Sequence, residues 1–192
     1  MDAPLTETKL MSMEDWLDQF GDEPFEFVGG EKIPMSPSVY GSNYFANLIR
    51  DALNEVVKPK QLGDVYLELT IVFTENVRWV RKSLIPDIAF VAANKLVAFR
   101  AQHPNTWKEL PLMVIPDLVV EVISPTDRYS KVRSKVTRYL DEGVPLIWVV
   151  DYLEEVVEVY TLQGRHELRR GDTLTAGDII PGFELTLETL FT

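Results

Sequence analysis

Two acidic residues stand inside apolar segments, where a charged side chain needs a specific reason to be. Glu121 interrupts the run LVVEVI at positions 118–123, and Asp87 precedes the run IAFV at 88–91. Both runs are predicted to be strands, because β-branched and apolar residues follow one another there. An ionised carboxylate without a partner in such surroundings costs several kcal/mol or stays protonated. We therefore expect a positive charge to compensate these two carboxylates.

A divalent cation is the compensation that this pair of acids favours. If the strands that carry Asp87 and Glu121 are neighbours, they lie about 4.8 Å apart, which lets both carboxylates bind one Mg²⁺ or Mn²⁺ ion. Asp117 is a poorer partner, because along one strand it lies about 13 Å from Glu121. Each acid also has a structural interpretation, as a helix cap or an arginine partner. That alternative is stronger for Asp87 than for Glu121, which stands in mid-strand.

A basic helix is predicted after Glu121, over residues 126–142, and Gly143 follows it as a residue suited to a helix end. Lys135 lies on the flank of the buried stripe of this helix, where a long side chain can deliver its ammonium to the strand ends. Arg128 occupies the same flank. The spacing assigns four residues to the stripe itself: Val132, Val136, Tyr139 and Leu140.

The other basic residues of this helix point more toward solvent. There they can contact phosphates. A solvated helix surface, whose cations suit the helix C-terminus and the acidic surroundings, is the simpler interpretation. These residues are Lys131, Arg133 and Arg138.

Two acids on adjacent strands with a lysine nearby are typical of phosphodiester hydrolysis. The acids would hold a divalent cation, the cation would activate water and offset phosphate charge, and the lysine would orient that water or stabilise the developing charge. No rival chemistry has a comparable signal, because the sequence has no Gly-x-Ser-x-Gly elbow, phosphate-binding Gly-rich loop or dinucleotide fingerprint.

The composition excludes several other classes of protein. The chain has 192 residues, no cysteine, and 19 basic against 30 acidic residues, which gives a net charge of −11. No disulfide scaffold, thiolate metal site or cysteine nucleophile is available, and two histidines make a histidine-rich zinc site improbable. The acidic balance argues against nonspecific nucleic-acid coating, although it leaves room for a local basic site.

The length and hydropathy favour one cytoplasmic domain over residues 1–192. A chain of this size buries about 70% of its unfolded surface and forms a single core. No apolar run approaches the roughly 20 residues that cross a bilayer, so we expect no membrane association. The N-terminal residues lack the basic start and apolar core of an export signal.

The order of predicted elements favours an α/β fold with a mixed sheet flanked by helices. A helix is expected over residues 10–20, with Ser12 as N-cap, then a β-hairpin over 24–32 and a second helix over 42–57. The polar segment 96–109 has no clear prediction. The expected strands cover residues 65–74, 85–92, 114–124, 145–151 and 156–160.

The sequence resembles the Uma-type restriction endonuclease family over roughly residues 10–190. The matching motifs are FEFVGGE at 25–31, MSP at 35–37, PDI at 86–88 and PDLVVEVISP at 116–125, followed by Lys135, Tyr139, Gly143-Val144, Trp148 and Asp151. This family belongs to the PD-(D/E)XK nuclease superfamily. The resemblance implies a restriction-endonuclease-like core, dependence on a divalent metal and often a homodimer.

Carried over by position, the resemblance assigns the two acids to Asp87 and Glu121 and the lysine to Lys135. The usual superfamily lysine follows the second acid by two residues, and that position here is Ile123, so the lysine must have moved onto the helix. Family members often have a histidine where this chain has Tyr40. A further acid before the core is supplied by Glu26 or Glu31, of which Glu26 is slightly favoured.

These observations support one main hypothesis, a Mg²⁺-dependent DNA endonuclease or related phosphodiesterase with Asp87 and Glu121 as metal ligands. The alternative is a catalytically inactive nuclease fold that serves as a binding or interaction module, since a net charge of −11 repels DNA at long range. RNA or a small phosphodiester is a third substrate class. Trp79 and Trp107 have no assigned partner, which fits a homodimer or ordinary core packing equally.

Overall fold

The computed structural model describes residues 9–35, 37–125 and 127–192, with only the backbone of Glu75. Ser36 of the MSP motif, Thr126 near the expected helix start, and residues 1–8, where we expected no export signal, lie outside it. The described helices are α1 (Met13–Asp22), α2 (Tyr40–Val57), α3 (Ala93–Gln102), α4 (Tyr129–Asp141) and α5 (Leu187–Leu190). None of them is long and apolar enough to cross a membrane.

The strands of this part of the chain form three sheets. The central sheet has the order β11-β10-β9-β8-β7-β4, a second has the path β1-β6-β2-β3 with β5 beside β6, and β12 pairs with β13. Their bounds are β1 (Met11–Ser12), β2 (Phe25–Val28), β3 (Glu31–Pro34), β4 (Gly63–Leu67), β5 (Ile71–Asn76), β6 (Trp79–Leu84), β7 (Ile88–Ala92), β8 (Leu118–Val122), β9 (Leu146–Asp151), β10 (Val156–Thr161), β11 (Gly164–Arg169), β12 (Thr173–Thr175) and β13 (Glu184–Thr186).

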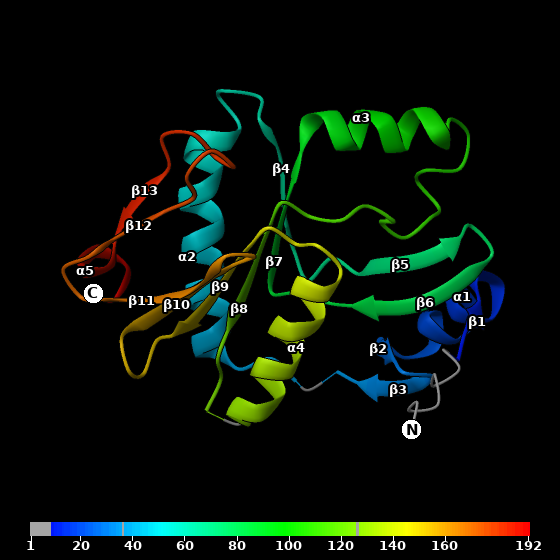
Figure 1. Cartoon of the computed structure of the whole chain (residues 1–192), viewed down its shortest axis with the longest axis horizontal. Helices are drawn as coiled ribbons and strands as arrows, with labels where there is room; N and C mark the ends of the chain where they lie inside the picture. Colours follow the sequence, from blue (N-terminus) through cyan, green and yellow to red (C-terminus); the bar gives the residue numbers. More distant parts are fainter. Residues whose placement is uncertain (1–8, 36, 126) are drawn as a thin grey trace, which may run out of the picture.

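Helix α4 connects the parallel pair of the central sheet. Strands β8 and β9 run parallel, whereas β7 pairs with β8 in the antiparallel sense. A parallel pair needs a crossover connection, and α4 supplies it. Figure 1 shows α2 and the C-terminal segments on one side of this sheet and α4 on the other. The mixed sheet flanked by helices is therefore confirmed.

Along β8, even-numbered and odd-numbered side chains lie on opposite faces of the central sheet. In β8, Leu118, Val120 and Val122 pack in the core that includes α2, while Val119 packs in the core that includes Val132 and Val136 of α4. Side chains alternate between faces along a strand. Glu121 therefore belongs to the face that α4 covers.

The second sheet brings the N-terminal hairpin alongside the central sheet. Strand β2 pairs with β3 and with β6, and its apolar side chains pack with α1 around the buried Trp16. Ser83 of β6 is fully buried and accepts hydrogen bonds from the Trp16 indole and the Phe27 amide. This arrangement fixes β2, and with it Glu26, against the edge of the central core.

Most of the predicted elements form, and one of the predicted strands is wrong. Ser12 caps α1 by accepting the Asp15 amide, and Gly143 follows α4 with a φ of 85°. The segment 65–74 was expected to be one strand, but the chain turns at Glu68, whose φ is 48°. It forms β4 in the central sheet and β5 in the second sheet, because each half pairs with a different partner.

Candidate active site

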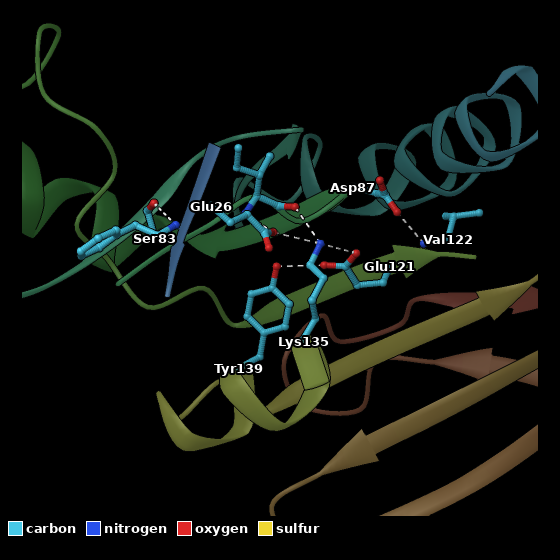
Figure 2. A network of polar contacts seen from close by, with 9 residues as sticks. Glu26, Ser83, Asp87, Glu121, Val122, Lys135 and Tyr139 are labelled. Carbon is cyan, nitrogen blue, oxygen red and sulfur yellow. Dashed lines mark hydrogen bonds and ion pairs between the residues drawn. The ribbon is translucent and has the colours of Figure 1, made fainter. Parts of the chain in front are cut away.

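The two predicted acids meet on one face of the central sheet. Ile88 of β7 stands opposite Val120 of β8, so one step further along this antiparallel register Asp87 stands opposite Glu121. Both carboxylates line a cavity of about 480 Å³ between the sheet, α4 and the segment that follows β3. The expectation that their strands are neighbours is confirmed. Figure 2 shows the polar network around them.

Lys135 lies at the centre of this network. Its Nζ is 2.8 Å from Glu121 Oε2, 3.2 Å from Glu26 Oε1 and 3.1 Å from the Ile85 carbonyl oxygen. Two of these contacts are hydrogen bonds, to Glu121 and to the Ile85 carbonyl, and the contact with Glu26 is an ion pair. The side chain is on the flank of the buried face of α4, where the spacing placed it, and it reaches the sheet as Figure 2 shows.

Glu121 is held from two directions by α4. Its Oε2 accepts the Lys135 ammonium, and its Oε1 accepts the Tyr139 hydroxyl at 2.9 Å. Lys135 and Tyr139 are four residues apart, so they lie on the same side of the helix one turn from each other. Tyr139 is fully buried and Glu121 is 7% exposed. The helix therefore fixes the orientation of this carboxylate.

Asp87 is held by the backbone of the neighbouring strand. Its Oδ2 accepts the Val122 amide at 2.6 Å, and its side chain is partly exposed to the cavity. Figure 2 shows the carboxylate turned toward Val122, on the side of Glu121 away from Glu26. Among the described residues its Oδ1 has no hydrogen-bond partner, which leaves that oxygen available to a ligand in the cavity.

Glu26 is the third carboxylate of the site. It stands on β2, is 6% exposed, and accepts the Ile85 amide at 3.1 Å in addition to its contact with Lys135. Glu31 is exposed at the start of β3 and does not line the cavity. Of the two acids left open by the sequence, the structure brings Glu26 to the network.

The site has fewer basic than acidic groups, and the pKa values of two of its carboxyl groups are raised. Burial, first of all, raises the pKa of Glu121 to about 8, and the neighbouring Asp87 and Glu26 carboxylates add to it against the opposing effect of Lys135. Burial also raises the pKa of Asp87. With all groups ionised, one ammonium and the three carboxylates sum to 1 − 3 = −2, which is the charge that a divalent cation balances.

Lys135 and Tyr139 keep their protons in this environment. Burial alone would lower the pKa of Lys135, but the carboxylates of Glu121, Glu26 and Asp87 outweigh it and raise that pKa. Burial and the Glu121 carboxylate raise the pKa of Tyr139 well above its ordinary value. Lys135 is therefore a permanent cation near neutral pH, suited to stabilising negative charge and unsuited to accepting a proton.

Comparison with known proteins identifies the family. The sequence model of the Uma2 family, described as "Putative restriction endonuclease", matches residues 12–188. The chain belongs to this Uma2 family. The match covers the strands, the helix and the hairpin that carry all four acidic and basic residues of the network. A search of curated proteins finds no match.

A solved structure confirms the fold that the family implies. It is the crystal structure of a "putative nuclease belonging to DUF820" from Anabaena variabilis ATCC 29413, with a TM-score of 0.74 and 22% sequence identity. The alignment covers 91% of this chain and 96% of that chain. This Uma2 protein thus shares the mixed α/β fold of that structure, in agreement with the restriction-endonuclease-like core expected from its sequence.

Asp87 and Glu121 fit a metal site that has only two carboxylate ligands from the protein. Among the described residues, no group of three or more His, Cys, Asp or Glu side chains is placed to hold a metal ion. A closed cage of protein ligands is therefore not formed here. Mg²⁺ commonly uses only one or two carboxylates and completes its shell with water and substrate phosphates. Asp87 and Glu121 fit this second kind of site, because their oxygens retain unused lone pairs.

The sequence argument expected a divalent cation, with an ammonium close by, to compensate the two buried acids. The structure supplies the ammonium: Glu121 has the Lys135 ammonium and the Tyr139 hydroxyl as partners, and Asp87 has the Val122 amide. The helix supplies part of the compensation within the protein. It does not supply all of it, since the pKa of Glu121 stays raised to about 8.

The other residues singled out from the sequence are Asp117 and the remaining basic residues of α4. Asp117 has a structural role, and two of the basic residues line the cavity. Asp117, at the opposite end of β8, accepts the Ala92 amide at 2.8 Å and pairs with Lys95 at 2.8 Å. Arg128 is exposed at the N-cap of α4 and does not line the cavity. Lys131 and Arg138 do line it, whereas Arg133 faces solvent away from it.

Sequence reasoning missed two groups of the network. Tyr139 was assigned to the buried stripe of α4 and to a family motif, and its hydroxyl contact with Glu121 was not foreseen. The Ile85 backbone, which donates to Glu26 and accepts from Lys135, carries no side-chain signal at all. For Tyr139 a signal existed: a buried tyrosine one turn after Lys135 needs a partner for its hydroxyl.

Proposed function

We propose that this protein is a nuclease that uses Mg²⁺ or Mn²⁺ to cleave DNA within the cavity lined by Asp87 and Glu121. The observation that carries the proposal is the convergence of three carboxyl groups and one ammonium at one cavity: Glu26 and Glu121 contact Lys135, and Asp87 lines the same cavity. Perturbed ionisable groups that converge in a cavity favour a functional site over a structural ion pair. Membership of the Uma2 family supports phosphodiester hydrolysis as the chemistry.

In this proposal each residue of the network has a separate task. Asp87 and Glu121 would hold the divalent cation, which when bound lowers the pKa of water and offsets the charge of the phosphate. Lys135 stabilises the negative charge that develops on the phosphoryl oxygens, because it remains an ammonium. Glu26 positions Lys135 through their 3.2 Å contact, and Tyr139 positions Glu121.

A cleavage assay with matched variants tests the proposal. Plasmid, single-stranded DNA and RNA are incubated with the protein in Mg²⁺ or Mn²⁺, and the DNA substrates are expected to be cut. Glu121→Gln and Asp87→Asn should reduce cleavage by about 10²-fold or more. Asp117→Asn is the matched control, since it removes an acid from the other end of β8, outside the cavity. Equal cleavage by wild type and Glu121→Gln would remove Glu121 from the mechanism.

The alternative function is a binding module that keeps the nuclease fold without activity. It is favoured by the net charge of −11 and by the finding that, among the described residues, no group of three or more His, Cys, Asp or Glu side chains is placed to hold a metal ion. Calorimetry separates the two functions. A catalytic protein binds Mg²⁺ in a manner that depends on Asp87 and Glu121, whereas an inactive module shows no binding that these two carboxylates control.

We propose further that the protein is a homodimer, on the strength of its exposed aromatic surface. Trp79 of β6 is 43% exposed and Val77 beside it is 61% exposed. Trp107 does not contribute, because it is partly buried beside Leu112 and Arg100 lies over its ring. Sedimentation velocity on wild type and Trp79→Ser tests this: a dimer that dissociates in the variant is expected, and a monomeric wild type would contradict it.

A further inference from the structure

We propose that one side of α4 binds the phosphodiester backbone of the substrate strand on both flanks of the scissile phosphate. This inference rests on the proposed function and names the surface that would recognise the strand. The side is defined by Ser130, Lys131, Ser134, Lys135 and Arg138, all of which line the cavity.

The spacing of these residues places them on one side of the helix. At about 100° per residue, Lys131 and Arg138 lie within about 20° of each other around the helix axis. The apolar residues Val132, Val136 and Tyr139 are buried on a different side, against the sheet. Arg133 is separated from Lys131 and Arg138 by about 140–160°, and it does not line the cavity. The helix thus presents its cations to the cavity, which Val132 also lines, and Val136 and Tyr139 to the core.

Lys131 and Arg138 line the cavity and have no acidic partner among the described residues. Arg81, Lys95 and Arg165 each pair with a carboxylate. In the part of the chain that the structure describes, neither Lys131 nor Arg138 has an ion pair or a side-chain hydrogen bond. A net charge of −11 offers many acids, so two unpaired cations at one cavity are free to meet an anionic ligand.

Two serine hydroxyls lie on the same side of the helix as these cations. Ser130 and Ser134 line the same cavity, and their side chains have no hydrogen bond among the described residues. Arginine, lysine and serine side chains are the usual partners of phosphate oxygens in protein complexes with nucleic acids. The combination of cations and hydroxyls on one surface therefore favours a phosphate over an uncharged or apolar ligand.

The length of the surface fits a strand rather than a single phosphate. Lys131 and Arg138 are seven residues apart, which is about 10 Å along the helix axis. Phosphates of one strand rise by about 3.4 Å each along a duplex axis, and the strand also winds around that axis, so a surface of about 10 Å spans more than one phosphate. Lys135 lies between the two cations in the sequence and contacts Glu121. The strand would therefore run along α4, with the scissile phosphate at Lys135.

A carboxylate outside α4 supports this orientation. Glu68, which follows β4, also lines the cavity. Its carboxylate repels a phosphate, whereas the cations of α4 attract it.

Salt-dependent binding tests the inference without any need for cleavage. Fluorescence anisotropy in EDTA measures the affinity of the full-length protein for a labelled oligonucleotide, single-stranded or duplex, at several KCl concentrations. The slope of log K against log [KCl] is negative. Each lost phosphate contact makes it less negative, by about 0.9 for duplex or about 0.7 for single strands. Lys131→Ala and Arg138→Ala are each expected to show this loss, and the double variant twice as much.

Arg133→Ala is the matched control, because it removes the same charge from the same helix outside the cavity. Its slope is expected to equal that of wild type, and Arg138→Lys should retain most of the wild-type slope. Circular dichroism confirms that each variant is folded. Equal slopes for Arg133→Ala and the two cavity variants, or wild-type protein that binds neither oligonucleotide, would overturn the inference.

The experiment also separates this inference from the proposed function. If the slopes change as expected while no substrate is cleaved in Mg²⁺ or Mn²⁺, the backbone-binding surface stands and the catalytic proposal fails. If wild type cleaves DNA and Glu121→Gln does not, but Lys131→Ala and Arg138→Ala keep the wild-type slope, the catalytic proposal stands and this inference fails.

Discussion

Two glutamates that contact cations in this protein have pKa values shifted in opposite directions. Glu142, which follows α4, pairs with Arg81 at 2.6 Å and with Lys82 at 2.7 Å. Burial acts to raise its pKa, but these two cations outweigh burial and lower it. Glu121 shares the single ammonium of Lys135 with Glu26, and its pKa is raised to about 8.

The difference indicates which cluster is structural and which is functional. Around Glu142 two cations serve one acid, so the cluster is complete within the protein. Around Glu121 one cation serves three acids, so the cluster lacks positive charge and lines a cavity from which a cation can enter. A group with a perturbed pKa in a cavity is a functional candidate, whereas a satisfied ion pair stabilises the fold.

The largest expected effect follows from removing the Lys135 ammonium, the cation that contacts Glu121 in the described part of the chain. Lys135→Met keeps the apolar part of the side chain and deletes the ammonium. We expect kcat for DNA cleavage in Mg²⁺ to fall by about 10²–10³-fold, the usual cost of losing one electrostatic stabiliser of a transition state. Single-turnover cleavage measures this, with Arg133→Met as the matched control on the same helix. Undiminished cleavage by Lys135→Met would show that the ammonium has no part in the reaction.

Removing a charge from the Glu142 cluster should lower the stability of the fold and leave cleavage activity unchanged. Glu142→Gln removes the charge that Arg81 and Lys82 share. Because hydrogen bonds to charged groups contribute about 1.5–3 kcal/mol, we expect the free energy of unfolding to fall by about that amount. Urea denaturation measures the loss. Cleavage by the folded variant should stay within about twofold of wild type, and a large loss of cleavage would erase the distinction between the two clusters.

A smaller effect is expected from Tyr139→Phe, which deletes only the hydroxyl that holds Glu121. Groups that orient a metal ligand typically contribute about 10-fold to 100-fold in metal affinity or activity. We expect the Kd for Mn²⁺ to rise by about 10-fold, with kcat much less affected once the metal is saturating. Calorimetric titration with Mn²⁺ checks this. An unchanged Kd would mean that Lys135 alone positions the carboxylate.

The pH dependence of stability sharpens the comparison. The folded state holds the Glu121 proton up to about pH 8, whereas the unfolded state loses it near its ordinary value of 4.5. The unfolded state thus binds fewer protons between these pH values, so stability in metal-free buffer falls as pH rises through this window, by at most about 1.4 kcal/mol per pH unit. Urea denaturation of wild type and Glu121→Gln across pH 5–8 should show this slope only in wild type.

Glu142 should give the opposite slope in a different window. Its folded pKa is lowered from 4.5, so its contribution to stability is present above that value and is lost as pH falls through its folded pKa. The difference in unfolding free energy between wild type and Glu142→Gln should shrink below about pH 4.5. A difference that stays constant down to pH 3 would contradict the charge-based account of this pair.

Much of the candidate site was predictable because its signals are local. An acid within an apolar strand and a lysine on the flank of a helix stripe are properties of short segments, and they placed Glu121 and Lys135 correctly. Glu26 was accessible only through the family resemblance. Its contact with Lys135 depends on how the N-terminal sheet packs against the central sheet, and no periodicity in the sequence reports that packing.

The errors in the fold also have physical causes. The break between β4 and β5 has no glycine or proline at Glu68, so the sequence gives no turn signal there. Strand β6 was missed because Arg81 and Lys82 interrupt its apolar pattern, and both serve Glu142, which is distant in sequence. Helix α3 has no side-chain cap at its N-terminus, which removed the usual start signal.

The central claim is that the cluster around Glu121 is completed by a divalent cation, and a crystal soaked in Mn²⁺ tests it most directly. The account predicts one anomalous peak within coordination distance of both the Asp87 and Glu121 carboxylates, and none at Glu142. Well-ordered side chains with no peak at these two carboxylates, at a high concentration of Mn²⁺, would contradict the account.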